Sequence, residues 1–326
     1  MCGTMTIYKE LSFENDVKSI EGVQFSILDY ASIKRMSVCE ITSTDTYSGS
    51  EPIIGGLFDS RMGVIENDKI CKTCMQKNAF CPGHFGHINL ARPVFHSQLF
   101  DTVRKVLRCV CYRCSALLID PEDDAVCKII NKKISRQKKF DLIYKLSSGK
   151  VKTCGGNNSN PLQGCGAKQP NKIQKENIGR IIMSWKNEEK DCPAAKALDQ
   201  IQKDRDKKVE FLAEDVLNIL KRISDRDANI LGFNRETTRP ESLICTVFPV
   251  PPPSVRPSVR NDTGQRCEDD LTHKLCDIIK TNNTLKTKID SNSTKETIDT
   301  WTKLVQYHVS TFVDNQLPGV APAKQR

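Results

Sequence analysis

The sequence predicts an α+β protein in which an irregular domain of short helices and strands is followed by an antiparallel helical hairpin. Three observations lead to this prediction. Stretches rich in cysteine, glycine and proline interrupt residues 50–170, where long regular elements do not fit. Short alternating and helical apolar patterns surround these stretches. Two long helical patterns then follow a run of prolines. With 326 residues, two domains or one elongated domain are expected.

The elements expected before the proline run are short. Alternating and then helical apolar positions predict a strand, a short helix and a second strand over residues 20–42. Apolar residues near helical spacing predict helices over 95–109, 135–146 and 204–222, of which the last has the clearest pattern. Residues 51–63 are expected to form a loop, residues 70–90 have the composition of a metal knuckle rather than of a helix, and residues 153–169 are rich in glycine and asparagine and irregular.

Five prolines between residues 247 and 260 require an extended or polyproline-like backbone, which makes this segment the best candidate boundary. Helical patterns follow over 271–289 and 298–312, and the polar residues 291–296 between them favour a turn. Two such helices joined by a short turn form an antiparallel hairpin, which we expect to be a coiled coil.

Composition and charge exclude several classes of protein. Hydrophobic residues make up 38% and charged residues 27%, as in ordinary soluble proteins. No apolar run approaches the ~20 residues of a membrane span, and the charged N-terminal region is not that of a secretory signal. The net charge of +9 is concentrated after residue 70, and nine Lys or Arg face one acidic residue over 128–152. Such clustering indicates a polyanion partner, with a solvated helix face as the alternative.

Fifteen cysteines, an odd number without an export signal, indicate a reducing intracellular compartment. Clustered cysteines bind metal there more often than they form disulfides. The first cluster is Cys71-x2-Cys74-x6-Cys81-x2-His84. Two closely spaced pairs with three thiolates and one imidazole are typical of a closed structural zinc site. His87 is a rival fourth ligand, and buried or redox-active cysteines are the alternative interpretation.

The second cluster is less regular. Cys111-x2-Cys114 has the spacing of a metal knuckle, whereas Cys154-x10-Cys165 does not, although both of its members lie in glycine-rich turns. Cys109 could compete for the metal. From spacing alone, the two pairs could also be unrelated half-sites.

No catalytic site is predicted. The sequence contains no Walker motif, no Gly-x-Gly-x-x-Gly fingerprint and no Gly-x-Ser-x-Gly elbow. Two Asp-x-Asp pairs, beginning at Asp204 and Asp225, lie in polar helical stretches and are better explained as solvated faces. Nothing assembles a nucleophile, a base and an electrophile.

Residues 71–96 read Cys71-Lys-Thr-Cys74-x6-Cys81-Pro-Gly-His-Phe-Gly-His-Ile-x-Leu90-x-x-Pro93-Val-Phe-His96. This stretch resembles the N-terminal zinc motif of the largest subunit of archaeal and eukaryotic DNA-directed RNA polymerases. Further ordered stretches agree with that family, and the resemblance covers the chain from about residue 20 to its end. The stretches that agree are Ile54 to Leu57 with Arg61 to Gly63, Ile230 to Asn234 with Arg239-Pro240, Val250 to Ser258, and Gln265 to Thr272.

The resemblance implies a domain organisation. Residues 1–245 are similar to the clamp core and head, with two zinc knuckle sites. Residues 246–268 match the proline-rich lid, 269–314 the clamp helices, and 315–326 the start of the rudder. The second zinc is held in the family by cysteines that align with Cys111, Cys114, Cys154 and Cys165.

The resemblance also implies a function. A clamp holds template DNA and the RNA–DNA hybrid during transcription, and the phosphate contacts expected here are the lid arginines Arg256, Arg260 and Arg266, with the basic stretch 128–152. Implied partners are other polymerase subunits, including the second-largest, and initiation and elongation factors at the coiled-coil tip; no membrane is involved. The family's magnesium-binding aspartate loop is absent, so magnesium belongs only to the complete polymerase, a nucleotidyltransferase.

The resemblance sets expectations for the origin of the chain. It stops inside a structural element, which suggests a fragment, a split gene or an interrupted reading frame. Divergence between the motifs fits a viral or protist polymerase, located in the nucleus, or in a viral factory or virion. The alternative from another class is a stand-alone zinc-dependent nucleic-acid-binding or regulatory protein derived from such a fragment.

Overall fold

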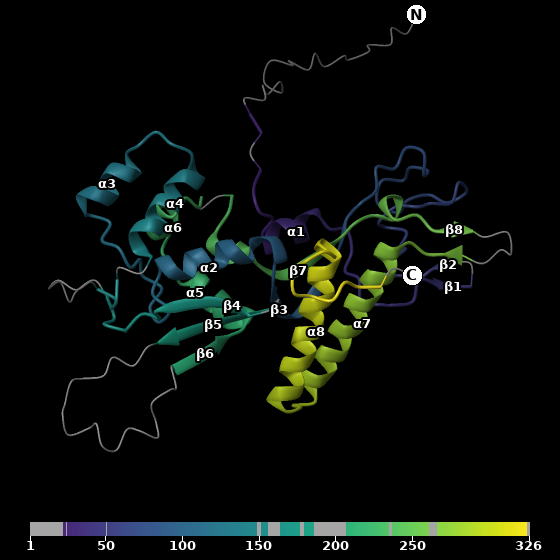
Figure 1. Cartoon of the computed structure of the whole chain (residues 1–326). Coiled ribbons are helices and arrows are strands. Elements are labelled where there is room, and N and C mark those ends of the chain that lie inside the picture. Colours follow the sequence, from purple (N-terminus) through teal and green to yellow (C-terminus); the bar gives the residue numbers. More distant parts are fainter. Residues whose placement is uncertain are drawn as a thin grey trace, which may run out of the picture.

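The computed structural model describes residues 22–23, 25–49, 51–148, 151–155, 164–176, 179–185, 207–234, 237–260 and 266–324. The predicted mixture of helices and small sheets is confirmed (Figure 1). The helices are α1 (Tyr30–Met36), α2 (Phe100–Cys109), α3 (Asp124–Ile130), α4 (Arg136–Ser147), α5 (Ala213–Lys221), α6 (Asp225–Ile230), α7 (Asp270–Asp290) and α8 (Lys295–Val313), with short 3-10 turns η2 (Ser97–Leu99), η5 (Pro240–Leu243) and η6 (Pro253–Val255).

Among the described residues, all pairs of strands are antiparallel and the sheets are small. Three sheets have two strands: β1 (Tyr47–Ser48) with β2 (Glu51–Pro52), β3 (Gly86–Phe95) with β7 (Ile244–Val250), and β8 (Val259–Arg260) with β9 (Arg266–Cys267). One sheet has three strands in the order β4 (Lys172–Glu176), β5 (Arg180–Trp185) and β6 (Lys207–Phe211).

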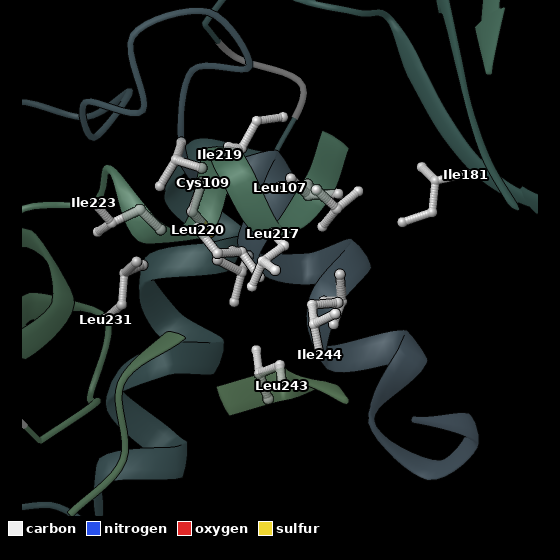
Figure 2. Packing of buried hydrophobic residues seen from close by; sticks show 14 of the residues in the cluster. Leu107, Cys109, Ile181, Leu217, Ile219, Leu220, Ile223, Leu231, Leu243 and Ile244 are labelled. Carbon is white, nitrogen blue, oxygen red and sulfur yellow. The ribbon is translucent and has the colours of Figure 1, made fainter. Parts of the chain in front are cut away.

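The β3–β7 ribbon joins two hydrophobic cores. Phe95 and Ile244 at one end of the ribbon belong to the first core, which α2, α4, α5 and the β4–β6 sheet complete (Figure 2). Ile88 and Phe248, in register nearer the other end, belong to the second core, which α7 and α8 cover. The two cores therefore share one pair of strands.

Two buried amides on α7 and α8 hold the helices to β3, where the register with β7 shifts between Asn89 and Val94. Asn282 Oδ1 accepts the N–H of Ala91 (2.8 Å), and its Nδ2 donates to Asn89 O (2.9 Å). Gln306 Oε1 accepts the N–H of Phe95 (2.6 Å), and its Nε2 donates to the carbonyl of the same residue (2.8 Å). These side chains satisfy backbone groups of β3 that would otherwise be buried without partners.

Some expected elements differ from the observed ones. The predicted helix 204–222 is shorter, because residues 207–211 form β6 and pair with β5 before α5 begins; residues 204–206 lie outside the described part. The β4–β5 hairpin was not predicted. Of the strand–helix–strand expected over 20–42, the structure has α1 and a single parallel bridge between Glu40 and His87. In the described residues, no helix is both long and apolar enough to cross a membrane.

Candidate metal centres and the proline segment

The four residues of the first cluster come together as predicted; we call this group centre 1. One ligand atom each from Cys71, Cys74, Cys81 and His84 lies within 4.8 Å of the other three, and Cys81 Sγ is 3.7 Å from His84 Nε2. Four ligands bound tetrahedrally at about 2.0–2.3 Å from one zinc ion would be separated by roughly 3.5–3.8 Å. Centre 1 could hold a metal ion.

The second cluster also comes together as one group, centre 2, so its two pairs are not unrelated half-sites. The four sulfurs lie within 4.8 Å of one another; Cys111 Sγ is 3.6 Å from Cys165 Sγ, and Cys114 Sγ is 3.5 Å from Cys154 Sγ. The irregular second pair is possible because Gly155 and Gly164 pack backbone against backbone. A Cβ on Gly164 would lie 2.5 Å from Gly155 N.

The first pair in each centre forms the same tight turn. The N–H of Met75 donates to Cys71 O (2.9 Å), and the N–H of Ser115 donates to Cys111 O (2.9 Å). Both residues adopt a positive φ, 55° and 64°. The N–H two residues after each leading cysteine points at its sulfur at 3.4 Å. Such N–H···S contacts stabilise a thiolate, which is the form that binds metal.

Two rival ligands are occupied elsewhere. His87 lies on β3, where its Nδ1 is 2.7 Å from Ser37 Oγ. The same hydroxyl lies 3.0 Å from Cys39 O, and both contacts are hydrogen bonds in the tautomer that carries its proton on Nδ1. Cys109 is fully buried and accepts a hydrogen bond from Ser147 Oγ (3.2 Å), and burial raises the pKa of its thiol to about 11.

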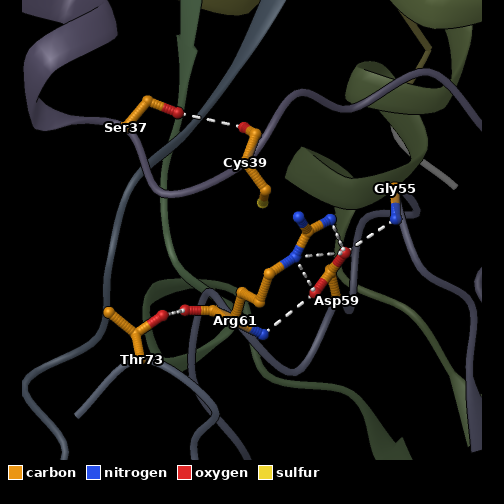
Figure 3. Close-up of polar contacts among 6 residues, drawn as sticks. All are labelled: Ser37, Cys39, Gly55, Asp59, Arg61 and Thr73. Atoms are coloured by element: carbon orange, nitrogen blue, oxygen red, sulfur yellow. Dashed lines mark hydrogen bonds and ion pairs between the residues drawn. The ribbon is translucent and has the colours of Figure 1, made fainter.

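An ion pair between the buried carboxylate of Asp59 and the more exposed Arg61 lies next to centre 1 (Figure 3). Asp59 accepts hydrogen bonds from the N–H groups of Gly55 (2.7 Å) and Arg61 (2.9 Å) and from the Arg61 guanidinium (2.6 Å). The carbonyl of Arg61 in turn accepts a hydrogen bond from Thr73 Oγ1 (2.6 Å), and Thr73 lies between the ligands Cys71 and Cys74 in the sequence. Burial alone would raise the pKa of Asp59, but the bonds from Arg61 and Gly55 outweigh it and lower the pKa. Sequence reasoning missed this support, although Arg61 lies in a family motif.

The residues 249–260, here called the proline segment, contain a predicted phosphate contact that the structure places inside the protein. Arg256 is 0% exposed. Its guanidinium donates to Pro251 O (3.1 Å), to Thr272 Oγ1 (3.3 Å) and to the carbonyl of Leu57, and it lies over the Phe58 ring. Burial lowers its pKa to about 10, so it stays charged at neutral pH. In this structure Arg256 cannot reach a phosphate.

The other two predicted arginines occupy one hairpin. Arg260 and Arg266 are in register on β8 and β9; their side chains lie outside the described part. In the basic stretch, Lys132, Lys133 and Lys138 are exposed between and along α3 and α4, as both the phosphate contact and the solvated helix face require. Among the described residues, none of these three makes an ion pair within 4.0 Å.

The described residues thus form a fold of small sheets and helices with two groups of four ligand-type side chains, each of which could hold a metal ion. The chain belongs to the family RNA polymerase Rpb1, domain 1, whose model matches residues 17–326. It is also similar to the DNA-directed RNA polymerase subunit Rpo1N of Methanocaldococcus jannaschii, with 38% identity over 311 residues, or 95% of this chain. The chain spans 21% of the length of that relative.

Proposed function

We propose that the chain is the clamp portion of the largest subunit of a DNA-directed RNA polymerase and holds template DNA and the RNA–DNA hybrid. The family match over nearly the whole chain is the observation that carries this proposal. Residues 1–245 would form the clamp core and head, 246–268 the lid, 269–314 the clamp helices and 315–326 the start of the rudder. The packing of α7 against α8 supports the third of these assignments.

Centres 1 and 2 would each hold one structural zinc ion. Four closely spaced ligand atoms in each centre leave no position for a substrate, as in closed structural sites. Metal analysis of the purified chain should return close to two zinc ions, and Cys74→Ser and Cys114→Ser should each lose one. One ion or none in freshly folded wild-type protein would contradict one or both assignments.

The exposed lysines of the basic stretch would contact phosphates of nucleic acid. These lysines, Lys132, Lys133 and Lys138, are exposed between and along α3 and α4. In Figure 1 these two helices lie on the side of the molecule away from α7 and α8. Arg260 and Arg266 remain candidates in the lid, whereas Arg256 does not. No helix in the described part of the chain resembles one that reads base edges, so binding should be weak, independent of sequence and strongly dependent on salt.

A triple lysine-to-glutamine variant at 132, 133 and 138 tests this contact. The slope of log K against log salt should fall by roughly 2–3, about 0.7–0.9 for each phosphate that is no longer neutralised. A matched variant at the exposed lysines Lys280, Lys286 and Lys295 of α7 and α8 keeps the same net charge and should leave more of the binding intact. If both variants lost the same amount of affinity, the loss would follow from net charge alone, and a specific contact between the basic stretch and phosphates would be contradicted.

Catalysis and assembly would depend on the rest of the polymerase. The implied partners are the other subunits, including the second-largest, and transcription factors at the turn between α7 and α8, in an intracellular setting such as a nucleus or viral factory. The magnesium site would lie outside this chain. The isolated chain should therefore incorporate no nucleotide on any template, and template-dependent synthesis by the chain alone would refute the proposed function.

A further inference from the structure

Arg256 joins three segments that are distant in sequence. Its guanidinium donates to Leu57 O in the loop before centre 1, to Pro251 O in the proline segment and to Thr272 Oγ1 on α7. Among the described residues, no carboxylate lies within 4.0 Å of its nitrogens. A planar guanidinium offers several donors in fixed directions, whereas the single nitrogen of lysine cannot reach three separated acceptors with the same geometry.

Centre 1 touches the proline segment directly. Gly83, between the ligands Cys81 and His84, has a φ of +80°. A Cβ on this glycine would lie 2.8 Å from Pro252 Cβ and 2.8 Å from Ser254 Oγ. The backbone of the second ligand pair is therefore packed against the start of η6, with no room for a larger residue.

The backbone provides a further connection. Gly86, two residues after His84, pairs with Val250 at the end of β7, and the proline segment continues from there. Within the segment, the N–H groups of Val255 and Arg256 donate to Pro252 O and Pro253 O, both at 3.1 Å. These two amides exchange with solvent only when η6 opens, so their exchange rate reports the order of the segment.

Centre 2 has no such connection in the described residues. Its ligands pack with Leu118 and Ala167. Cys165 comes shortly before β4, which in Figure 1 lies on the other side of α7 and α8 from β8. The chain thus contains two centres of closely related chemistry, of which one contacts the proline segment.

We propose that Arg256 is a positioning residue that fixes the proline segment against centre 1, and that metal at centre 1, but not at centre 2, controls the order of this segment. Metal binding orders residues 71–84, and Gly83 and the Leu57 carbonyl transmit that order to Pro252 and Arg256. The inference rests on the metal binding proposed above, but not on the proposed role in transcription.

Hydrogen exchange of the full chain, followed by mass spectrometry, tests the proposal through peptides covering residues 254–260. Arg256→Lys keeps the charge and should raise exchange there about tenfold, while peptides of α5 stay unchanged. Thr272→Val removes one acceptor with little change in shape and should give a smaller rise in the same peptides. Arg222→Lys, at an exposed arginine of the chain, is the matched control and should have no effect.

The metal arm uses a matched pair of variants. Cys74→Ser should raise exchange at 254–260, whereas Cys114→Ser should raise it around centre 2 and leave 254–260 as in the wild type. Metal analysis accompanies both variants. Loss of the ion from centre 1 with unchanged exchange at 254–260, or an equal rise in both variants, would overturn the coupling. A wild-type chain without metal would overturn the metal dependence and the proposed zinc together, while Arg256→Lys still tests the positioning role separately.

Discussion

Replacing Asp59 by asparagine tests the support around centre 1 with little change in shape. The carboxylate is 1% exposed and receives hydrogen bonds from Gly55 N, from Arg61 N and from the Arg61 guanidinium. All three partners are donors. An asparagine amide can accept through only one oxygen and turns its NH2 group towards another donor, so at least one of these hydrogen bonds is broken.

The expected size follows from the burial of the two partners. Removing one member of a buried ion pair typically costs about 3–5 kcal/mol. Arg61 is 38% exposed and can recover water, so we expect about 2–3 kcal/mol after screening. Thr73 lies between the ligands Cys71 and Cys74 and donates a hydrogen bond to the Arg61 carbonyl. Loss of this support should weaken metal binding at centre 1 about tenfold, the lower limit of the effect typical for residues that hold metal ligands in place.

Competition with a chromogenic chelator measures the affinity, and thermal melts measure the stability. One of the two ions should be released at a lower chelator concentration in Asp59→Asn, and the melting temperature should fall by roughly 5 °C. The control variant Glu210→Gln removes an ion pair with Arg180 in which the carboxylate is 51% exposed. Because exposed ion pairs contribute little, it should change neither the metal release nor the melting temperature measurably. An Asp59→Asn chain with wild-type metal release and melting would refute the reasoning.

Three further outcomes are expected. Gln306→Leu leaves the N–H and C=O of Phe95 buried without partners and should lower the unfolding free energy in urea by about 2–4 kcal/mol; an unchanged midpoint would contradict the amide contact. Gly232→Ala places a Cβ 3.0 Å from Arg136 O at a φ of +88° and should cost about 1–3 kcal/mol in the same assay, and full stability would show that the strain is absent. The folded pKa of Asp59 is lowered, so the stability that its carboxylate provides is fully present above the unfolded pKa of about 3.9 and is lost as pH falls through the folded pKa. The difference between the acid melts of wild type and Asp59→Asn should therefore begin to shrink below about pH 4.

The helices on either side of the proline segment were predicted closely from sequence. The patterns over 135–146, 271–289 and 298–312 correspond to α4, α7 and α8 within a few residues. Their apolar positions repeat at helical spacing, and that repeat is a local property of the chain. The ligands of centre 1 were equally local, since all four lie within fourteen residues.

The rest depends on contacts between distant residues. Arg256 has the same local sequence signal whether it faces solvent or the interior, and only the approach of Leu57 and Thr272 decides its burial. The β4–β5 hairpin was missed because Lys172–Glu176 is mostly polar and gains its strand conformation from pairing with β5. The second pair of ligands in centre 2 required two glycine backbones to meet, which spacing alone does not reveal.

The shared β3–β7 ribbon has a consequence for biosynthesis. β3 leaves the ribosome long before its partner β7 and before Gln306, which completes its end. At a translation rate of about 5–20 residues per second, roughly 10–40 s pass between the synthesis of β3 and that of Gln306 on α8. The four residues of centre 1 lie in one short stretch and are complete throughout that interval. The emerging chain therefore presents these four side chains beside a strand with an unpaired edge, and unpaired strand edges are sites at which chains associate.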